Sequence, residues 1–175
     1  MFARPSFLAL LAALALATAR AHADDVQRRE DQFKAAYLFN FVKFVEWPTG
    51  SSSDSLTVCF LGGAGVHEAL TNGIDSKRVG ARKLVARRIE RPATVATCEV
   101  LYADAASADP TLATGLPILT VSDAPGFAAR GGMIELFTEN HRLRFVINVA
   151  HVHKAGLRIS SDLLKLAASV EREER

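Results

Sequence analysis

Three glycines that follow an apolar run could cradle a phosphate group. Gly62, Gly63 and Gly65 come directly after Leu61, between a predicted strand and a predicted helix, which is where a phosphate-binding loop belongs. The third glycine of the dinucleotide pattern is missing, because the residues after Gly65 read VHE. We therefore predict a tight strand-to-helix turn in place of a nucleotide site.

Two histidines separated by one residue could share a metal ion. His151 and His153 would face the same side of a strand, whereas on a helix they would diverge. The sequence offers no third ligand nearby, because His141, Glu139 and Glu135 belong to other predicted elements. The pattern favours exposed histidines without a metal.

Other catalytic patterns are missing from the sequence. It contains no nucleophile-elbow motif, no cluster of cysteine ligands and no pair of carboxylates in a catalytic setting. We predict that the protein is not an enzyme and uses neither a cofactor nor a metal. A hydrolase with a non-standard site is the alternative, and it would lose activity on esters or phosphates when His151 or His153 is changed.

Residues 1–23 have the layout of a secretory signal. Arg4 precedes an apolar run from Phe7 to Ala17, and Ala21-His22-Ala23 supplies the small residues of a cleavage site. The apolar run is too short to span a bilayer comfortably. We expect cleavage near Ala23 and one exported, periplasmic domain over residues 24–175, which is long enough to bury a good core. An uncleaved anchor is the alternative.

Removal of this segment changes the charge of the protein. Residues 1–23 contain two basic residues, Arg4 and Arg20, and no acidic residue, so 19 basic residues remain against 19 acidic ones. A formally neutral domain gives no electrostatic support for binding nucleic acid.

Cys59 and Cys98 are the only cysteines in the chain. An even number of cysteines in an oxidising compartment predicts a disulfide. Closing a loop of this length would stabilise the fold by roughly 4 kcal/mol. Two buried free thiols are the alternative.

Seven basic residues crowd the segment from 77 to 91. Such a charge density is typical of a solvent-exposed strand and its turn, and in a neutral domain it could also bind an acidic partner or an anionic ligand. The seven are Lys77, Arg78, Arg82, Lys83, Arg87, Arg88 and Arg91.

The elements that position these residues are organised around one aromatic helix, FKAAYLFNFVKFVEWP, over Phe33–Pro48. Pro48 is expected to end it, because the residue before a proline avoids the helical conformation. The helix needs cover from the sheet of its own domain, while the rim around Trp47 could stay open to a ligand or a second chain. One apolar face is predicted for Phe33, Tyr37, Phe41 and Phe44.

Short apolar segments alternate with short helical segments in the rest of the chain. Predicted helices are a short one ending at Leu70, Ala105–Ala113, a segment near Pro125–Ala129, and Asp162–Ala168 with Ser160 or Ser161 as its cap. Predicted strands are Leu56–Leu61, Lys83–Ile89, Glu99–Ala103, Pro117–Val121, Met133–Thr138 and Leu143–Val149, with Leu157–Ile159 extended. The last two long strands predict an antiparallel hairpin, and Glu171–Arg175 predicts a solvated tail. The fold class that follows is α/β, a three-layer sandwich with a mostly parallel sheet flanked by helices and a late antiparallel hairpin.

Three segments of the sequence resemble the YfiR family of periplasmic proteins. They read FKAAYLFNFVKFVEWP, LTVCFLG and GGMIELFTENHRLRFVINVAHVHKAGLRISSDLLKLA, and they lie at both ends of the expected domain. The resemblance implies an exported, non-enzymatic α/β regulator that tends to form a homodimer. It also implies binding to the periplasmic domain of an inner-membrane diguanylate cyclase of the YfiN type. The cyclase would be held inactive, with lower cyclic di-GMP and less biofilm formation.

The correspondence with the family can be followed residue by residue. Cys59 and Cys98 match a family cysteine pair in strand and spacing. A second cysteine pair, found in the later half of better-studied members, is absent here, so redox gating does not carry over. Many members read RFEIN where this chain reads RFVIN, so a ligand contact through that glutamate does not carry over to Val146.

We expect the surface near Trp47, Arg144 and Arg158 to contribute to a binding crevice for a partner or a small ligand. Trp and Arg are the residue types that dominate binding energy when they are desolvated, and ordinary packing and solvation of each residue is the alternative. The alternative function is a small-molecule-binding periplasmic module that serves another receptor, such as a sensor kinase or an outer-membrane transporter. A neighbouring gene for a diguanylate cyclase would count against that function.

Overall fold

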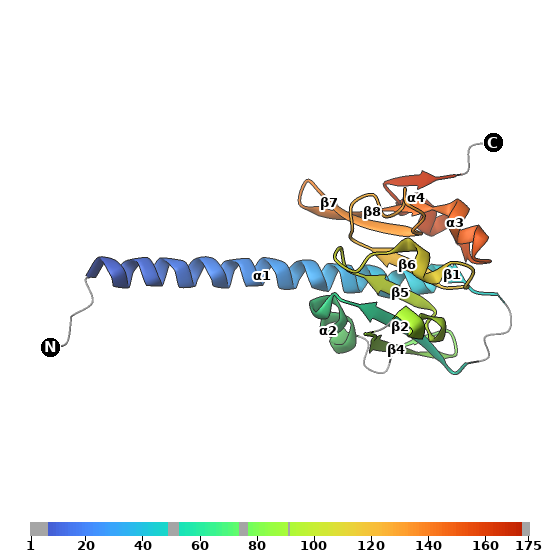
Figure 1. Ribbon diagram of the computed structural model, residues 1–175, viewed down its shortest axis with the longest axis horizontal. Helices are drawn as coiled ribbons and strands as arrows, with labels where there is room; N and C mark the ends of the chain where they lie inside the picture. Colours follow the sequence, from blue (N-terminus) through green and yellow to red (C-terminus); the bar gives the residue numbers. More distant parts are fainter. Residues whose placement is uncertain (1–6, 49–52, 74–76, 91, 173–175) are drawn as a thin grey trace.

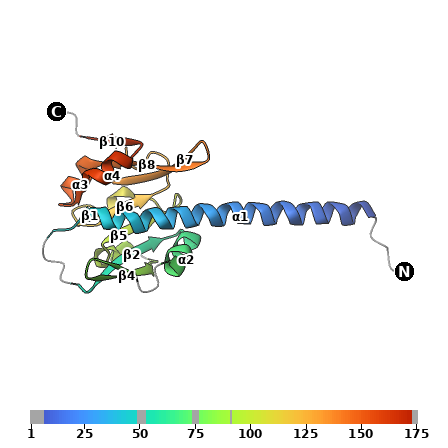
Figure 2. The ribbon, with the colours of Figure 1, turned by 180° about the vertical axis from the view of Figure 1, so that it is seen from behind.

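The computed structural model describes residues 7–48, 53–73, 77–90 and 92–172. Its centre is a mostly parallel sheet of eight strands, with the helix α1 (Phe7–Phe44) lying across one face (Figures 1 and 2). The strands in spatial order are β10 (Ser169–Glu171), β8 (Arg142–Asn148), β7 (Ile134–Glu139), β6 (Leu119–Ser122), β5 (Val100–Ala103), β2 (Ser55–Leu61), β4 (Arg82–Arg88) and β3 (Arg78–Val79).

The pairing of the strands follows the predicted fold class. The run from β4 through β2, β5 and β6 to β7 is parallel, β10 lies parallel to β8, and β7 and β8 form the late antiparallel hairpin. The four residues of β5 and the four of β6 are all buried, as expected for parallel strands that are covered on both faces. The predicted three-layer α/β sandwich is confirmed.

The second half of α1 supplies much of the main core. Leu38, Phe41 and Val42 are almost fully buried against the sheet, and the Phe41 ring meets the ring of Phe145 on β8 edge-on at 5.1 Å. Burial of a side chain of this size is worth about 1.5–3 kcal/mol. The first half of α1 projects away from the body of the protein (Figure 1).

Two details of the aromatic helix differ from the prediction. Phe33 is 61% exposed, because α1 turns Asp31 and the buried Lys34 toward the domain while Phe33 faces away from it. The helix also ends at Phe44, before Pro48, since the main-chain oxygen of Phe44 accepts from the N–H of Ser160 at 2.9 Å. The next two residues form β1 (Val45–Glu46), which pairs with β9 (Arg158–Ile159) in a separate antiparallel ribbon.

The two faces of the large sheet are covered differently. On the face of α1 lies α2 (Ala64–Gly73), which packs against α1. A second core cluster, which includes Cys59, Leu101 and Ile118, is covered by the 3₁₀ helices η1 (Pro92–Thr97) and η2 (Pro110–Ala113).

Two predicted helices on this second side are wrong. Over Ala105–Ala113 the helix shrinks to η2, because Asp109 caps it and Pro110 occupies its first turn, so that it starts late. The segment Pro125–Ala129 consists of turns, and the positive φ of 72° at Gly126 interrupts any helix there.

The carboxyl-terminal part closes the domain with capped, short helices. Ser160, one of the two predicted cap residues, caps α4 (Ser161–Leu166). The helix α3 (Val149–Lys154), capped by Asn148, was not predicted. The predicted solvated tail is wrong at Glu171, which belongs to β10, where Val170 pairs with Ile147. The rest of that tail beyond residue 172 lies outside the described residues. Within the described ranges, no helix is long and apolar enough to span a membrane.

Candidate functional site

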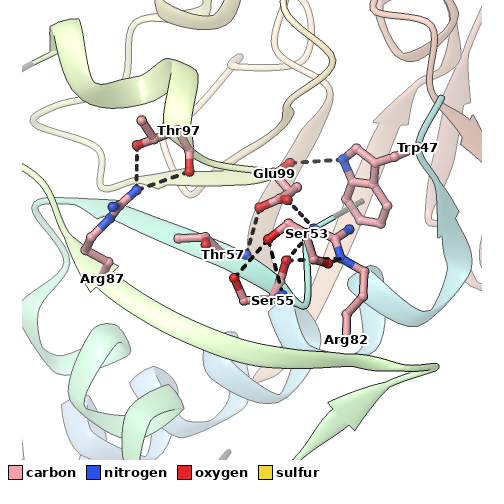
Figure 3. A network of polar contacts seen from close by, with 8 residues as sticks. All are labelled: Trp47, Ser53, Ser55, Thr57, Arg82, Arg87, Thr97 and Glu99. Atoms are coloured by element: carbon pink, nitrogen blue, oxygen red, sulfur yellow. Dashed lines mark hydrogen bonds and ion pairs between the residues drawn. The ribbon is translucent and has the colours of Figure 1, made fainter. Parts of the chain in front are cut away.

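Trp47 lies at the amino-terminal edge of the parallel strands, directly after β1. Its ring is half-buried against the main core, and the indole Nε1 donates to the main-chain oxygen of Glu99 at 3.3 Å (Figure 3). A ring with one apolar, packed side and one polar, accessible edge is the arrangement that makes Trp common at binding surfaces. The fold therefore presents Trp47 in a fixed orientation with part of its surface open.

The side chain of Glu99, whose main-chain oxygen accepts from Trp47, ties together β2 and β4. Its Oε2 accepts from the main-chain N–H of Thr57 on β2 at 2.8 Å, and its Oε1 forms an ion pair with Arg82 of β4. The exposed fractions of the Arg82 and Glu99 side chains are only 18% and 16%. Arg82 also donates through Nε to the main-chain oxygen of Ser55 at 3.0 Å (Figure 3). The Glu99 carboxylate and the Arg82 guanidinium bond each other and main-chain groups, so these contacts hold Glu99 in place. The main-chain oxygen of Glu99 in turn fixes the position of the Trp47 ring.

The disulfide predicted from the cysteine count is present next to this network. Cys59 on β2 and Cys98 are bonded, with their Cα atoms 5.8 Å apart. Arg87 reinforces the same segment, since its guanidinium donates to the Cys59 sulfur at 3.6 Å and to the main-chain oxygen of Thr97 at 3.1 Å. Arg82 and Arg87 are therefore engaged within the fold. So are two more of the seven basic residues of the segment from 77 to 91, since Arg78 donates to the main-chain oxygen of Ala81 and Lys77 lies over the Phe39 ring.

Arg158 lies close to Trp47. It pairs across the small ribbon with Glu46, the residue before Trp47, and its side chain is exposed. The hydrogen bond between Ser160 and Phe44 anchors the ribbon at the end of α1. The structure thus brings Trp47 and Arg158 near each other in the fold, with the Arg158 side chain on the exposed face of the ribbon beside Glu46 and the Trp47 ring on the face that packs against the core.

Arg144 lies elsewhere. It is opposite Phe137 in the β7–β8 hairpin, and its guanidinium pairs with the Glu139 carboxylate at 2.8 Å. Counted along the paired strands, it lies roughly six residues, or about 20 Å, beyond the level of Glu99. Trp47 and Arg158 therefore lie at one end of the parallel strands, and Arg144 lies at the opposite end.

The glycine turn after β2 has no room for a phosphate. Gly62 and Gly63 have positive φ values of 72° and 57°, and the N–H of Gly63 donates to the Asp104 carboxylate at 2.9 Å. A Cβ on Gly62 would lie 2.1 Å from this carboxylate. Burial alone would raise the pKa of Asp104, but hydrogen bonds from Gly63 and Ser107 outweigh it and lower the pKa. The Asp104 carboxylate therefore occupies the place in the loop where a phosphate would bind. This place is the switch point of the sheet, where open α/β sheets usually bind ligands.

His151 and His153 lie on a helix, α3. His151 is half-buried and His153 is exposed, so the two rings diverge as they would on any helix. Across residues 7–48, 53–73, 77–90 and 92–172, no group of three or more His, Cys, Asp or Glu side chains could hold a metal ion.

A polar cluster that no sequence pattern indicated lies at the edge where β6 ends. Lys34 of α1 bonds Asp123 at 2.6 Å and Glu30 at 2.8 Å, and the Tyr102 hydroxyl donates to the same Asp123 oxygen at 3.1 Å. Burial lowers the pKa of Lys34, but its hydrogen bonds to Asp123 and Glu30 outweigh this effect and raise it; burial and the Asp123 charge raise the pKa of Tyr102. The available signal was Lys34 itself, a charge within an apolar helix.

The chain was compared with curated proteins, with solved structures and with protein families. A search of the curated proteins finds no significant match. Among solved structures, a conserved domain protein from Vibrio cholerae O1 biovar El Tor matches with a TM-score of 0.43 and 15% sequence identity. The match covers 69% of this chain and 55% of that protein, so this chain spans about half the length of the solved relative.

The match to a protein family is broader. The model of the YfiR/HmsC-like family matches residues 31–168, which include every element from the docked half of α1 to α4. The resemblance seen in the aromatic helix and in the carboxyl-terminal segment is thereby confirmed. The chain belongs to the YfiR/HmsC-like family, a family of periplasmic, non-catalytic regulators of cyclic di-GMP signalling.

Proposed function

We propose that this protein represses an inner-membrane diguanylate cyclase by binding the periplasmic domain of that enzyme, which lowers cyclic di-GMP and biofilm formation. The observation that carries the proposal is the match of the YfiR/HmsC-like family over residues 31–168. Membership of the family supports a role in cyclic di-GMP signalling. That the partner is a diguanylate cyclase is our proposal.

Repression of this kind needs only preferential binding. A partner that exists in active and inactive conformations shifts toward the one that this protein binds more tightly. Moving the partner from almost fully active to almost fully inactive requires about a 10⁴-fold preference. A rigid surface suits this task, because little entropy is lost when an already ordered side chain binds.

The ribbon that carries Trp47 and Arg158 is our proposed contact surface. Trp47 is held by its bond to Glu99, and Arg158 lies beside Glu46 on the neighbouring strand. Both residue types contribute strongly to binding when a partner removes them from water. We propose Arg144, at the other edge of the sheet, as a separate contact, and its change is therefore tested alone.

The test is a pull-down of residues 24–175 from detergent-solubilised inner membranes. Arg158→Ala and Trp47→Phe are compared with the wild type, since Arg158 is exposed and phenylalanine keeps most of the packing at Trp47. Arg142→Ala is the matched control, because Arg142 is an exposed arginine at the hairpin, away from the ribbon. We expect recovery of a diguanylate cyclase by the wild type and by Arg142→Ala, and at least tenfold weaker recovery by the two ribbon variants.

Each outcome bears on a different part of the proposal. Recovery of a sensor kinase or an outer-membrane transporter in place of a cyclase would contradict it and favour the small-molecule-binding alternative. Unchanged recovery by both ribbon variants would move the contact surface away from Trp47 and Arg158. Loss on Arg144→Ala alone would assign the contact to the hairpin edge.

We further propose that the exported form begins near Asp24 and that it forms a homodimer. Mass spectrometry of protein isolated from the periplasm should give the mass of residues 24–175. Analytical ultracentrifugation of the same material should give twice that mass, and a single-chain mass at all concentrations would contradict the dimer.

A further inference from the structure

A cavity separate from the Trp47 ribbon lies at the amino-terminal ends of β6 and β7. It is about 270 Å³ in volume and lies between η2, the turn at Gly131 and helix α3. Residues that line it include Thr111, Thr120, Arg130, Gly131, His151 and Lys154. The volume is below the usual range for drug-sized ligands, so only a small molecule fits.

The polar lining of this cavity is one-sided in charge. The positively charged Arg130 and Lys154 come from two different segments and meet around it, and none of the described residues that line it is an Asp or Glu. In a domain whose total charge is close to zero, this is a local positive field within a concave surface. Concave walls of one charge sign concentrate counter-ions.

A buried hydroxyl group supplies a further donor. Thr120 is only 3% exposed, and its Oγ1 accepts from the N–H of Met133 at 3.1 Å. Because the oxygen is occupied as an acceptor, its hydrogen remains to be donated, and no acceptor for it lies among the described residues. Buried hydroxyl groups normally find such a partner, which points to an acceptor that comes from outside the chain.

The ring of His151 is arranged to donate as well. Its Nδ1 is buried and has no partner among the described residues, and an unpaired lone pair is tolerated there more readily than an unpaired N–H. Nε2 is therefore the ring nitrogen that is placed to donate to a ligand. Gly131, with a φ of 106°, lets the backbone pass close to this nitrogen, since a Cβ there would lie 3.3 Å from Nε2.

The guanidinium of Arg130 is positioned by one hydrogen bond. It donates to the main-chain oxygen of Pro125 at 2.6 Å. Within the described part of the chain this is its only hydrogen bond, so most of its five N–H donors are left for an anion. Guanidinium groups bind carboxylate and phosphate oxygens in pairs.

We propose that this cavity is a binding site for a small anion with a carboxylate or phosphate group, held by Arg130, His151 and Thr120. The site lies outside the Trp47 ribbon and does not depend on the identity of the membrane partner.

Isothermal titration calorimetry of residues 24–175 tests this site, with inorganic phosphate and succinate as separate probes and sodium chloride at equal ionic strength as the blank. Arg130→Gln and His151→Gln are the test variants. Arg142→Gln and His153→Gln are their controls, since Arg142 and His153 are exposed residues of the same types, and His153 lies on the same helix. We expect saturable binding of one probe or both, weakened roughly tenfold by each test variant and unchanged in the controls.

The probes separate the two sources of the anionic group. Binding of phosphate alone assigns a phosphorylated ligand, binding of succinate alone assigns a carboxylate, and binding of both assigns a site for either. The absence of saturable binding at millimolar concentrations of both probes would overturn the proposal. So would equal weakening by His151→Gln and His153→Gln. Circular dichroism spectra of the variants show whether a loss of binding reflects a loss of fold.

Discussion

At the scale of single residues, the buried charges of this protein are matched by partners far away in the sequence. Lys34 meets Asp123, and Arg82 meets Glu99, in each case between different layers or strands. Such pairs contribute little net stability, but they impose a large penalty when one partner is removed. Their main effect is therefore to fix the positions of α1 and of the strand ends, and their contribution to the free energy of unfolding is small.

The first prediction concerns Lys34→Met. The variant leaves the carboxylates of Asp123 and Glu30 without their shared cation, and one oxygen of Asp123 is already buried without a partner among the described residues. We expect the free energy of unfolding to fall by about 3 kcal/mol, measured by urea denaturation. The double variant Lys34→Met with Asp123→Asn should regain part of this loss. A loss below about 1 kcal/mol for the single variant would show that the pair is no more than a surface ion pair.

The second prediction concerns the pH dependence due to Asp104. Hydrogen bonds from Gly63 and Ser107 lower the pKa of this carboxyl below its value of 3.8 in the unfolded chain. The ionised form therefore stabilises the fold fully above pH 3.8, and the contribution is lost as the pH falls through the lower pKa of the folded state. In urea denaturation between neutral pH and the acid range, Asp104→Asn should be less stable at neutral pH and less sensitive to acid below pH 3.8. An equal acid sensitivity of both proteins would contradict this assignment.

At the scale of elements, the prediction from sequence succeeded where a pattern is local. The buried strands read as apolar, β-branched runs, and the structure places β2, β4, β5 and β6 within a few residues of the predicted ranges. The cap of α4 at Ser160 is equally local. Patterns of this kind depend on neighbours in the chain, so they can be recognised without the fold.

The elements that the sequence did not predict depend on distant parts of the chain. The two residues of β1 are strand only because β9 lies beside them, and β10 is too short to show a pattern before it pairs with β8. The same reason hides the polar cluster at Lys34, since its partner Asp123 is 89 residues away. At the candidate site, the sequence grouped Trp47, Arg144 and Arg158 and could not show that Arg144 lies at the opposite end of the strands.

The third prediction concerns the disulfide between β2 and the start of β5. Cys59 and Cys98 close a loop with a sequence separation of 39 residues, so Cys59→Ser with Cys98→Ser should lower the free energy of unfolding by about 4 kcal/mol in the chain-entropy description. Trp47 is the only tryptophan, and its bond to Glu99 places it next to Cys98. Denaturation followed by its fluorescence therefore reports on this region. The wild type in a reducing agent should match the double variant, and a wild type that keeps its stability when fully reduced would contradict the prediction.

At the scale of the whole molecule, α1 divides into a docked half and a projecting half (Figures 1 and 2). Residues 20–29 are all exposed, whereas Ala35, Leu38, Phe41 and Val42 belong to the core. A helical segment without tertiary contacts has little stability of its own at this length. The stability of the molecule is therefore uneven along this one helix.

The fourth prediction uses this difference. In hydrogen exchange of residues 24–175, the amides of residues 24–29 should exchange nearly as fast as in an unfolded chain, because no packed surface holds their helix together. The amides of residues 35–42 should exchange only through global unfolding. The exposed Val26 and Phe33 lie seven residues apart on α1, so a partner could bind there and protect the projecting half. Strong protection of residues 24–29 that does not change with dilution would contradict the prediction. Protection that disappears on dilution would instead show that a second copy of the chain covers this part of the helix.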